Sequence, residues 1–118
     1  MRTSNVWAVI PAHNEQYSIA GIVRKTKKYA GNSVLVDDGS TDKTGELARQ
    51  AGAIVLKHIV NLGKGAALKT GCDFAVKNGA KFIIAIDADA QHSPNDIPRF
   101  IEKLKKYDIV FSYRKASR

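Results

Sequence analysis

Short apolar runs alternate with stretches of helical periodicity along the whole chain. The apolar runs are four to six residues long, the usual length of a strand, and they lie at 6–10, 33–36, 53–56, 81–86 and 108–112. Continuous rather than alternating apolar character is typical of parallel strands that are buried on both faces. The pattern therefore predicts five strands of a buried sheet.

Each of the four intervals between these runs predicts a helix. Apolar or small side chains recur there at helical spacing, which gives each helix one face suited to burial. Ser93 followed by Pro94 is a typical helix N-terminus, and Gly52 stands just after a predicted helix end. The predicted helices run from about Glu15 to Gly31–Asn32, from Thr41 or Asp42 to Gln50, through Leu68 to Gly79, and from Ser93 through Leu104.

Alternating strands and helices with short connections predict a three-layer α/β/α fold with a mostly parallel sheet between the helices. The 118 residues are the size of one compact domain, so we assign residues 1–118 to a single unit. Ligands of such sheets bind beyond the carboxyl ends of the strands, where the strand order reverses. The residues that follow each predicted strand are therefore the candidates for a functional site.

The composition is that of a globular domain with a basic excess. Hydrophobic residues make up 44% and charged residues 25%, and no apolar run approaches the roughly 20 residues that span a bilayer. The net charge of +8 would allow attraction to an anionic membrane surface or to phosphorylated substrates. No aromatic residues interleave with the basic clusters as a base-stacking surface requires, so nucleic acid is not an expected partner.

The lone cysteine, Cys72, excludes an internal disulfide and favours a reducing compartment. Residues 6–10 are too short for the apolar core of a secretion signal. We therefore expect a cytoplasmic protein, for which the basic charge would allow peripheral association with the cytoplasmic face of the membrane.

Two aspartates, Asp87 and Asp89, follow the buried run 82–86 and are separated by one residue. Their mutual repulsion calls for a positive group beside them. Mg²⁺ typically takes one or two carboxylates and fills its other positions with water and phosphate oxygens. The pair therefore predicts a divalent cation that carries phosphate, and a pair of solvated turn aspartates before the next helix is the alternative interpretation.

The common phosphate-binding motifs are absent. Gly65 stands where a P-loop needs Ser or Thr, and Leu68 stands where the dinucleotide fingerprint needs its third glycine. Asp38, at a strand end, could instead accept a hydrogen bond from a nucleobase N–H, with Gly39 letting the backbone pass close to the ligand. Lys64 and its flanking glycines could offer amides and a cation to phosphate or sugar, or form only a helix start with a solvated lysine.

Four segments of the chain, in this order and spacing, resemble the family 2 inverting glycosyltransferases of GT-A fold. They are 9–15 (Val-Ile-Pro-Ala-His-Asn-Glu), 36–42 (Val-Asp-Asp-Gly-Ser-Thr-Asp), 61–68 (Asn-Leu-Gly-Lys-Gly-Ala-Ala-Leu) and 87–94 (Asp-Ala-Asp-Ala-Gln-His-Ser-Pro). The resemblance is greatest to the dolichol-phosphate and polyprenyl-phosphate mannosyl- and glucosyltransferases. It implies the Rossmann-like, nucleotide-sugar-binding half of a GT-A fold and transfer from a GDP-mannose or UDP-glucose type of donor to a dolichol or polyprenyl phosphate.

The resemblance also implies two groups of site residues. The nucleotide sugar would be held by Pro11, His13, Glu15, Val36, Asp38, Lys64 and Asp87. A divalent cation, Mg²⁺ or Mn²⁺, would be held by Asp87, Asp89 and Gln91, and Asp89 would be the catalytic group. His13 stands where the family often has a tyrosine. The metal would act as a Lewis acid on the departing nucleoside diphosphate.

The chain has no residue that can be assigned as a base for the acceptor, and members of this family continue beyond the segment that ends here. We therefore expect residues 1–118 to bind the donor and to transfer sugar poorly unless a partner or a homo-oligomer completes the site. A non-catalytic module that binds nucleotide sugar or nucleic acid is one alternative. A receiver-like signalling domain is another, but its acidic pair would follow the first strand, whereas Asp37 and Asp38 follow the second.

Overall fold

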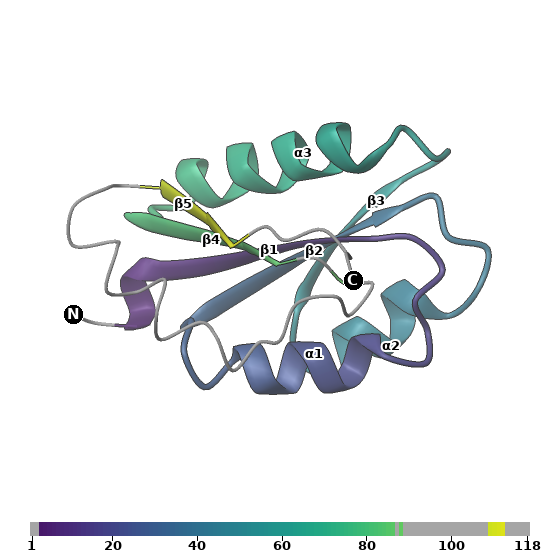
Figure 1. The fold of residues 1–118 in the computed structure, drawn as a ribbon, viewed down its shortest axis with the longest axis horizontal. Coiled ribbons are helices and arrows are strands. Elements are labelled where there is room, and N and C mark those ends of the chain that lie inside the picture. The colour runs from purple at the N-terminus through teal and green to yellow at the C-terminus, as the bar shows by residue number, and fades with distance from the viewer. Residues whose placement is uncertain (1–2, 87, 89–108, 113–118) are drawn as a thin grey trace, which may run out of the picture.

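The computed structural model describes residues 3–86, Ala88 and the strand at 109–112 (Figure 1). Five parallel strands form one sheet in the order β3-β2-β1-β4-β5. The predicted strands are confirmed, and their bounds are β1 Val6–Ala12, β2 Asn32–Asp38, β3 Ile54–His58, β4 Phe82–Ile86 and β5 Ile109–Ser112.

Helices cover both faces of this sheet. A 3-10 turn, η1 (Thr3–Asn5), precedes β1. Helices α1 (Ile19–Thr26) and α2 (Thr44–Gln50) lie on one face, and α3 (Lys64–Lys77) lies on the other (Figure 1). The predicted three-layer α/β fold is therefore correct. In the described part of the chain, no helix combines the length and the apolar character that crossing a membrane requires.

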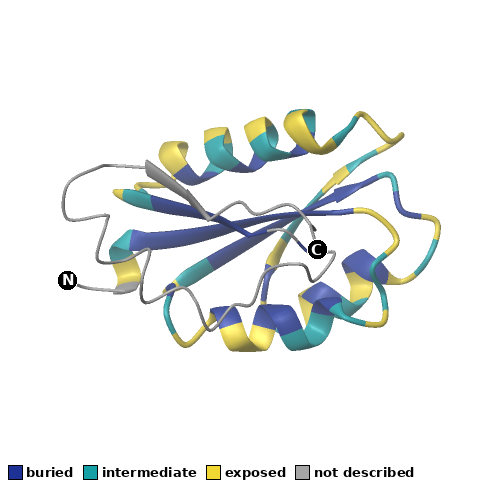
Figure 2. Cartoon of the chain, in the orientation of Figure 1, coloured by how far each residue is buried: buried dark blue, intermediate teal, exposed yellow. Residues whose placement is uncertain are grey.

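Strand β1 is buried along its whole length because both of its faces are covered (Figure 2). Ile10 and its even-numbered neighbours pack in the core beneath α1 and α2, while Trp7 and Val9 pack beneath α3. The Trp7 ring meets Phe74 of α3 edge to face at 6.0 Å. Cys72 packs in the same cluster, where burial, followed by the charge of Asp73, raises the pKa of its thiol. Both-sided burial explains why the strands read as continuous apolar runs.

The first predicted helix is too long at both ends. Helix α1 begins at Ile19 rather than near Glu15, because the preceding backbone turns aside at Asn14 (φ 55°). The amide of Glu15 donates to Thr44 Oγ1 (2.8 Å) rather than starting a helix. At the other end, α1 stops at Thr26 rather than near Gly31–Asn32. The fourth predicted helix, from Ser93 through Leu104, lies outside the described residues.

The strand order creates a crevice at the centre of the sheet. From β1 the chain moves outward through β2 to β3, and α3 then carries it back to β4 on the other side of β1. The chain therefore continues from β1 to β2 on one side and from β4 to β5 on the other side. Sheets of this kind bind ligands at such a reversal of strand order, beyond the carboxyl ends of the strands. The order also differs from the 2-1-3-4-5 order of flavodoxin-like folds, which argues against a receiver-like domain.

We predict opposite effects for two glycine-to-alanine changes in α3. A Cβ on Gly71 would collide with Val9 Cγ1 and lie 3.1 Å from Val36 Cγ2, whereas a Cβ on Gly65 would meet nothing within 4 Å. Gly71→Ala should lower the free energy of unfolding by about 1–3 kcal/mol through overpacking. Gly65→Ala should raise it by about 0.4–1 kcal/mol. Urea unfolding of both variants measures this, and a neutral Gly71→Ala would contradict the close packing of α3.

Candidate functional site

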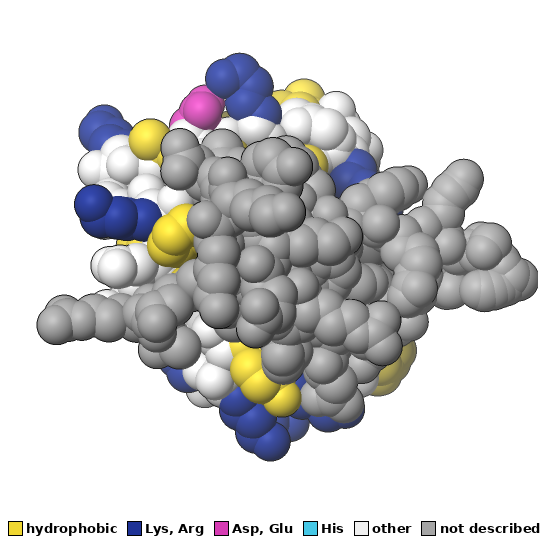
Figure 3. Space-filling view, turned by 60° about the vertical axis from the view of Figure 1, so that its left-hand side comes forward, with side chains coloured by type: hydrophobic (Ala, Val, Ile, Leu, Met, Phe, Trp, Pro, Cys, Tyr) yellow, Lys and Arg dark blue, Asp and Glu magenta, His cyan; other side chains and the backbone are white. Residues whose placement is uncertain are grey.

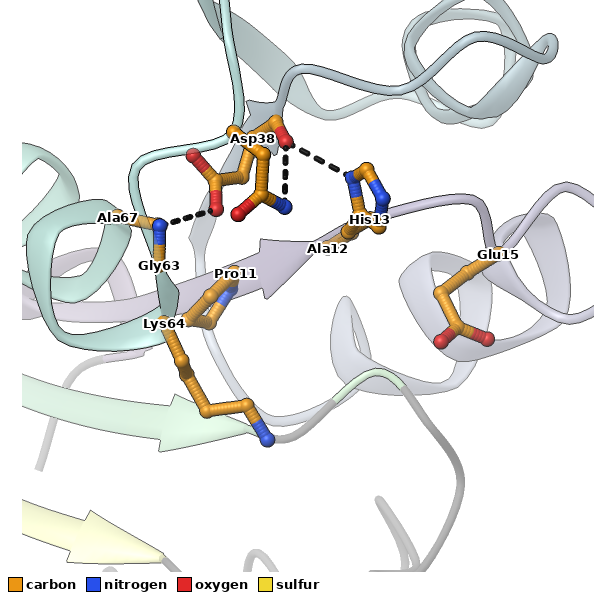
Figure 4. Close-up of a pocket in the computed structure, with 9 residues that line it drawn as sticks. Pro11, Ala12, His13, Glu15, Asp38, Gly63, Lys64 and Ala67 are labelled. Carbon is orange, nitrogen blue, oxygen red and sulfur yellow. Dashed lines mark hydrogen bonds between the residues drawn. The ribbon is translucent and has the colours of Figure 1, made fainter.

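A cavity of about 210 Å³ opens at the carboxyl ends of β1 and β2 (Figure 4). Strand β1 and the residues after it contribute one wall, and the segment that leads into α3 contributes the other wall. Asp38, the last residue of β2, also lines the cavity. The lining residues are Pro11, Ala12, His13, Glu15, Asp38, Asn61, Gly63, Lys64 and Ala67. Three segments that are distant in the sequence therefore meet around one hollow.

Asp38 holds two of these segments together. Its Oδ1 accepts hydrogen bonds from the Leu62 amide (2.9 Å) and from His58 Nδ1 (2.8 Å), and its Oδ2 accepts from the Gly63 amide (2.9 Å). The residue is only 3% exposed. Burial raises the pKa of this carboxyl, but the donors at Leu62, His58 and Gly63 outweigh burial, and the net pKa is lowered. Asp38 is therefore a buried anion at neutral pH.

The backbone carbonyl of Asp38 fixes the third segment. It accepts from His13 Nδ1 (2.9 Å) and from Asn61 Nδ2 (3.3 Å), as the dashed lines in Figure 4 show. A carbonyl can only accept, so Nδ1 of His13 carries the hydrogen. Asn14 Oδ1 accepts from the Thr41 amide (2.9 Å), which directs its Nδ2 to His13 Nε2 (3.2 Å). This network fits a neutral imidazole with a fixed ring orientation.

The absence of a side chain at Gly39 makes room for another part of the protein backbone rather than for a ligand. Its φ is 75°, and a Cβ there would lie 2.5 Å from the Asn61 nitrogen and 2.6 Å from the Val60 carbonyl carbon. The close approach expected from the sequence is therefore made by the 60–61 backbone. A side chain at Gly39 would push that backbone away from Asp38.

The adjacent residue Asp37 faces the opposite side of the sheet, as neighbouring side chains of a strand do. Its Oδ1 accepts from the Ser40 amide (3.0 Å), and its Oδ2 lies 3.8 Å from Lys57 Nζ. It lines a separate hollow of about 260 Å³ beside α2. Because the two carboxylates point apart, only Asp38 belongs to the first cavity.

Comparison with known proteins identifies the family. The family model for glycosyl transferase family 2 matches residues 7–117 of the chain. The chain belongs to glycosyl transferase family 2.

Individual relatives agree with this assignment. An uncharacterised protein of Methanocaldococcus jannaschii is 41% identical over 112 residues, covering 92% of this chain and 46% of its own length. An undecaprenyl-phosphate 4-deoxy-4-formamido-L-arabinose transferase of Pectobacterium carotovorum is 35% identical over 123 residues, covering 93% of this chain and 37% of its own. The chain thus spans less than half the length of these two relatives.

Solved structures show the same fold. Glucosyl-3-phosphoglycerate synthase from Mycobacterium tuberculosis, in complex with Mn²⁺, UDP and glucosyl-3-phosphoglycerate, superposes with a TM-score of 0.70 and 26% identity. The match covers 86% of this chain and 39% of the synthase chain. The α/β fold described above is therefore that of a family 2 glycosyltransferase.

Most of the nucleotide-site residues that the sequence predicted lie around the cavity. They are Pro11, His13, Glu15, Asp38 and Lys64. Figure 4 shows Lys64 extending along the cavity past Pro11. Val36 does not line it: this residue is fully buried, and its side chain packs beneath Gly71 of α3.

The predicted metal ligands Asp87, Asp89 and Gln91 lie outside the described residues. Within the part of the chain that the structure describes, no group of three or more His, Cys, Asp and Glu side chains could hold a metal ion. The metal assignment therefore stays a prediction from the sequence.

Two polar residues of the site were not assigned from the sequence. Asn61 reaches the Asp38 carbonyl from the segment before α3, and His58 holds the Asp38 carboxylate from the end of β3. A signal for His58 exists in the pattern, since this histidine follows the apolar run 53–56 just as Asp38 follows the run 33–36, each by two positions. The register that sets these two residues side by side, Asp38↔His58, appears only in the sheet.

We predict a pH-dependent stability difference for Asp38→Asn. Because the pKa of Asp38 is lowered from 3.8, its carboxylate stabilises the fold above that value and ceases to do so as the pH falls through the lowered pKa. At neutral pH the variant should lose about 1.5–3 kcal/mol of unfolding free energy, the value of a hydrogen bond to a charged group. The loss should shrink as the pH falls below 3.8.

Urea unfolding at several pH values measures this difference. Asp73→Asn is the matched control, because its side chain is 68% exposed and pairs with Lys69 on the surface of α3. It should cost less than about 0.5 kcal/mol at any pH. A deficit for Asp38→Asn that stays constant down to low pH would contradict the assigned role of the carboxylate.

Proposed function

We propose that this chain is the donor-binding part of a metal-dependent inverting glycosyltransferase that moves a sugar from a nucleoside diphosphate to a polyprenyl phosphate. The observation that carries the proposal is the cavity around Asp38. It gathers Pro11, His13, Glu15, Asp38 and Lys64, the residues that the family resemblance assigns to the donor. Family membership and a fold shared with a UDP-binding synthase support the same conclusion.

Two groups that line the cavity, Asp38 and Lys64, suit the base and the diphosphate of a nucleoside diphosphate. Asp38 offers a buried, ionised acceptor for a base N–H. Lys64 begins α3, and Ala67 makes the first backbone bond of that helix to the Gly63 carbonyl (3.0 Å). The positive end of this 14-residue helix and the Lys64 ammonium group favour the negative charge of phosphates.

We assign a divalent cation, Mg²⁺ or Mn²⁺, to Asp87, Asp89 and Gln91, with Asp89 as the catalytic group. Strand β4 ends at Ile86 beside the central strand β1, and Asp87 is the next residue in the sequence. Structures of the Mycobacterium tuberculosis synthase contain Mn²⁺ or Mg²⁺ together with UDP, which supports a metal of this kind. When bound, the cation would offset the charge of the departing diphosphate.

The acceptor and the location are inferred from relatives and from charge. The Pectobacterium relative is named as a transferase to undecaprenyl phosphate. A polyprenyl phosphate is already an anion at neutral pH, so its transfer needs positioning more than a protein base. In Figure 3, Lys and Arg side chains are spread around the described part of one face rather than gathered in a patch. The net charge of +8 would then favour the anionic cytoplasmic face of a membrane as a whole.

Sugar transfer from the donor by residues 1–118 alone should be weak. The residues assigned above all concern the donor, and a misplacement of the acceptor by about 1 Å can cost on the order of 100-fold in rate. Labelled nucleotide sugars with Mn²⁺ and a polyprenyl phosphate, compared with no acceptor, measure the transfer. A homo-oligomer or a further domain that contributes acceptor-binding residues would increase the transfer.

We predict that Asp89→Ala weakens Mn²⁺-dependent binding of a nucleoside diphosphate by more than tenfold, since even indirect losses at metal sites cost about 10–100-fold. Its thermal stability without metal should be unchanged or slightly higher, because one of two repelling carboxylates is removed. Calorimetry with UDP and GDP measures the affinities. Asp73→Ala is the control and should bind normally. Metal-independent binding by the parent chain would exclude the assigned cation site.

Asp38→Asn should weaken nucleotide binding by about 1–3 kcal/mol and retain the metal dependence, since the amide mispairs with a base N–H. Asp37→Asn is its matched control: this neighbour is also buried and also accepts from a backbone amide, but it faces the other side of the sheet. It should bind within about threefold of the parent, because its carboxylate faces a different hollow. The reverse result would assign the base contact to Asp37.

A further inference from the structure

His58 lies at the end of β3, directly beside Asp38 in the parallel register. Its side chain is 12% exposed and does not line the cavity. Nδ1 lies 2.8 Å from Asp38 Oδ1, and Nε2 lies 2.9 Å from Oγ1 of Thr70 on α3. The imidazole therefore connects the cavity carboxylate to the second turn of α3.

The direction of these hydrogen bonds follows from their partners. An ionised carboxylate can only accept, so Nδ1 of His58 must carry a hydrogen and donate it to Asp38. Thr70 can donate its hydroxyl hydrogen to Nε2 of a neutral ring. With one nitrogen bound to β2 and the other to α3, the ring cannot rotate without losing one bond.

Counting acceptor positions on Asp38 shows what is left for a ligand. A carboxylate has about four such positions, two on each oxygen. The Leu62 amide and His58 fill both positions on Oδ1, and the Gly63 amide fills one on Oδ2. In Figure 4 the oxygen bound by Gly63 points toward the residues that line the cavity, and the other oxygen points away from them. Among the donors of the described residues, none takes the fourth acceptor position, which lies on the cavity side.

We propose that His58 is a positioning residue that sets base selectivity, because it occupies Oδ1 of Asp38 and leaves one acceptor on Oδ2 for a base that presents a single N–H, as uracil does. The proposal rests on the proposed function and adds the class of base. Cytosine presents a ring nitrogen without hydrogen at the equivalent point, so it would meet the carboxylate acceptor to acceptor. Guanine presents two adjacent donors, of which one would stay unpaired.

His58 fixes the Asp38 carboxylate relative to the sheet, which the Leu62 and Gly63 amides do not do. Leu62 and Gly63 are neighbours on one connecting segment, so they can shift together with the carboxylate. His58 belongs to β3, which pairs with β2 along five register positions, from Val34↔Ile54 to Asp38↔His58. It therefore fixes Oδ1 relative to the sheet, and Thr70 fixes the ring relative to α3.

Two substitutions of His58, by Asn and by Gln, test its two hydrogen bonds separately. The side-chain nitrogen of Asn can take the place of Nδ1, so His58→Asn keeps a donor for Asp38 and loses the contact to Thr70. The side-chain nitrogen of Gln matches Nε2, so His58→Gln keeps a partner for Thr70 and loses the donor to Asp38. Thr70→Val removes the second bond from the other side and is the control for α3. The probes are UDP, CDP and GDP, each with Mn²⁺, in calorimetric titrations of the 118-residue chain.

The parent chain should bind UDP at least about tenfold more tightly than CDP or GDP, the effect of one mispaired buried polar group. His58→Asn and Thr70→Val should keep this UDP-to-CDP ratio within about threefold. His58→Gln should weaken UDP roughly tenfold and reduce the ratio by a similar factor, the value of one bond to a charged group. Thermal unfolding of each variant separates this pattern from a loss of fold.

Three results would overturn the inference. Equal binding of UDP and CDP or GDP by the parent would exclude selection by Asp38, while metal-dependent binding would leave the proposed function standing. Equal effects of Asn and Gln at position 58 would show that the donor to Oδ1 does not set selectivity. No binding of any nucleoside diphosphate by the parent would overturn both the proposed function and this inference. The first and third results are measured on the parent chain, so they do not depend on the stability of any variant.

Discussion

The buried carboxylate of Asp38 is the interaction on which the arrangement of the site depends. It draws the Leu62 and Gly63 amides and the His58 ring onto its two oxygens, while its backbone carbonyl takes His13 and Asn61. A buried charge is tolerated only when donors surround it, so the segments that supply those donors must lie where they do. The start of α3, the end of β3 and the residues after β1 are therefore placed by one anion.

Close backbone packing supports this arrangement. Gly39 has no Cβ where the 60–61 backbone passes, and Gly71 lets α3 approach Val9 and Val36. Both contacts bring α3 down onto the sheet with its N-terminus at the cavity. The positive end of α3 therefore lies beside Asp38, whose Oδ2 accepts from the Gly63 amide at 2.9 Å, and Lys64 at the start of the helix lines the same hollow.

The sheet order connects this local arrangement to the family. Parallel strands in the order β3-β2-β1-β4-β5 open a crevice between the ends of β1 and β4. The cavity lies on the β1–β2 side of the crevice, and β4, which ends at Ile86, borders the other side. The Mycobacterium tuberculosis synthase of the same fold contains Mn²⁺ together with UDP. In this chain the residues proposed for the nucleotide and the metal follow β1, β2 and β4 in the sequence, and the carboxyl ends of these parallel strands lie at the same edge of the sheet.

The sequence by itself determined the strands, the helical layers and the segments that carry the site, because periodicity and clusters of polar residues at strand ends are local properties. It also identified Pro11, His13, Glu15, Asp38 and Lys64, which the fold brings together. It could not give the start of α1 at Ile19, since residues 14–16 donate their amides to the segment around residues 40–44 instead of to a helix. Nor could it show that Asp37 and Asp38 have separate roles or that His58 holds Asp38. Those facts depend on strand register and on which face each side chain takes, and only the folded sheet decides both.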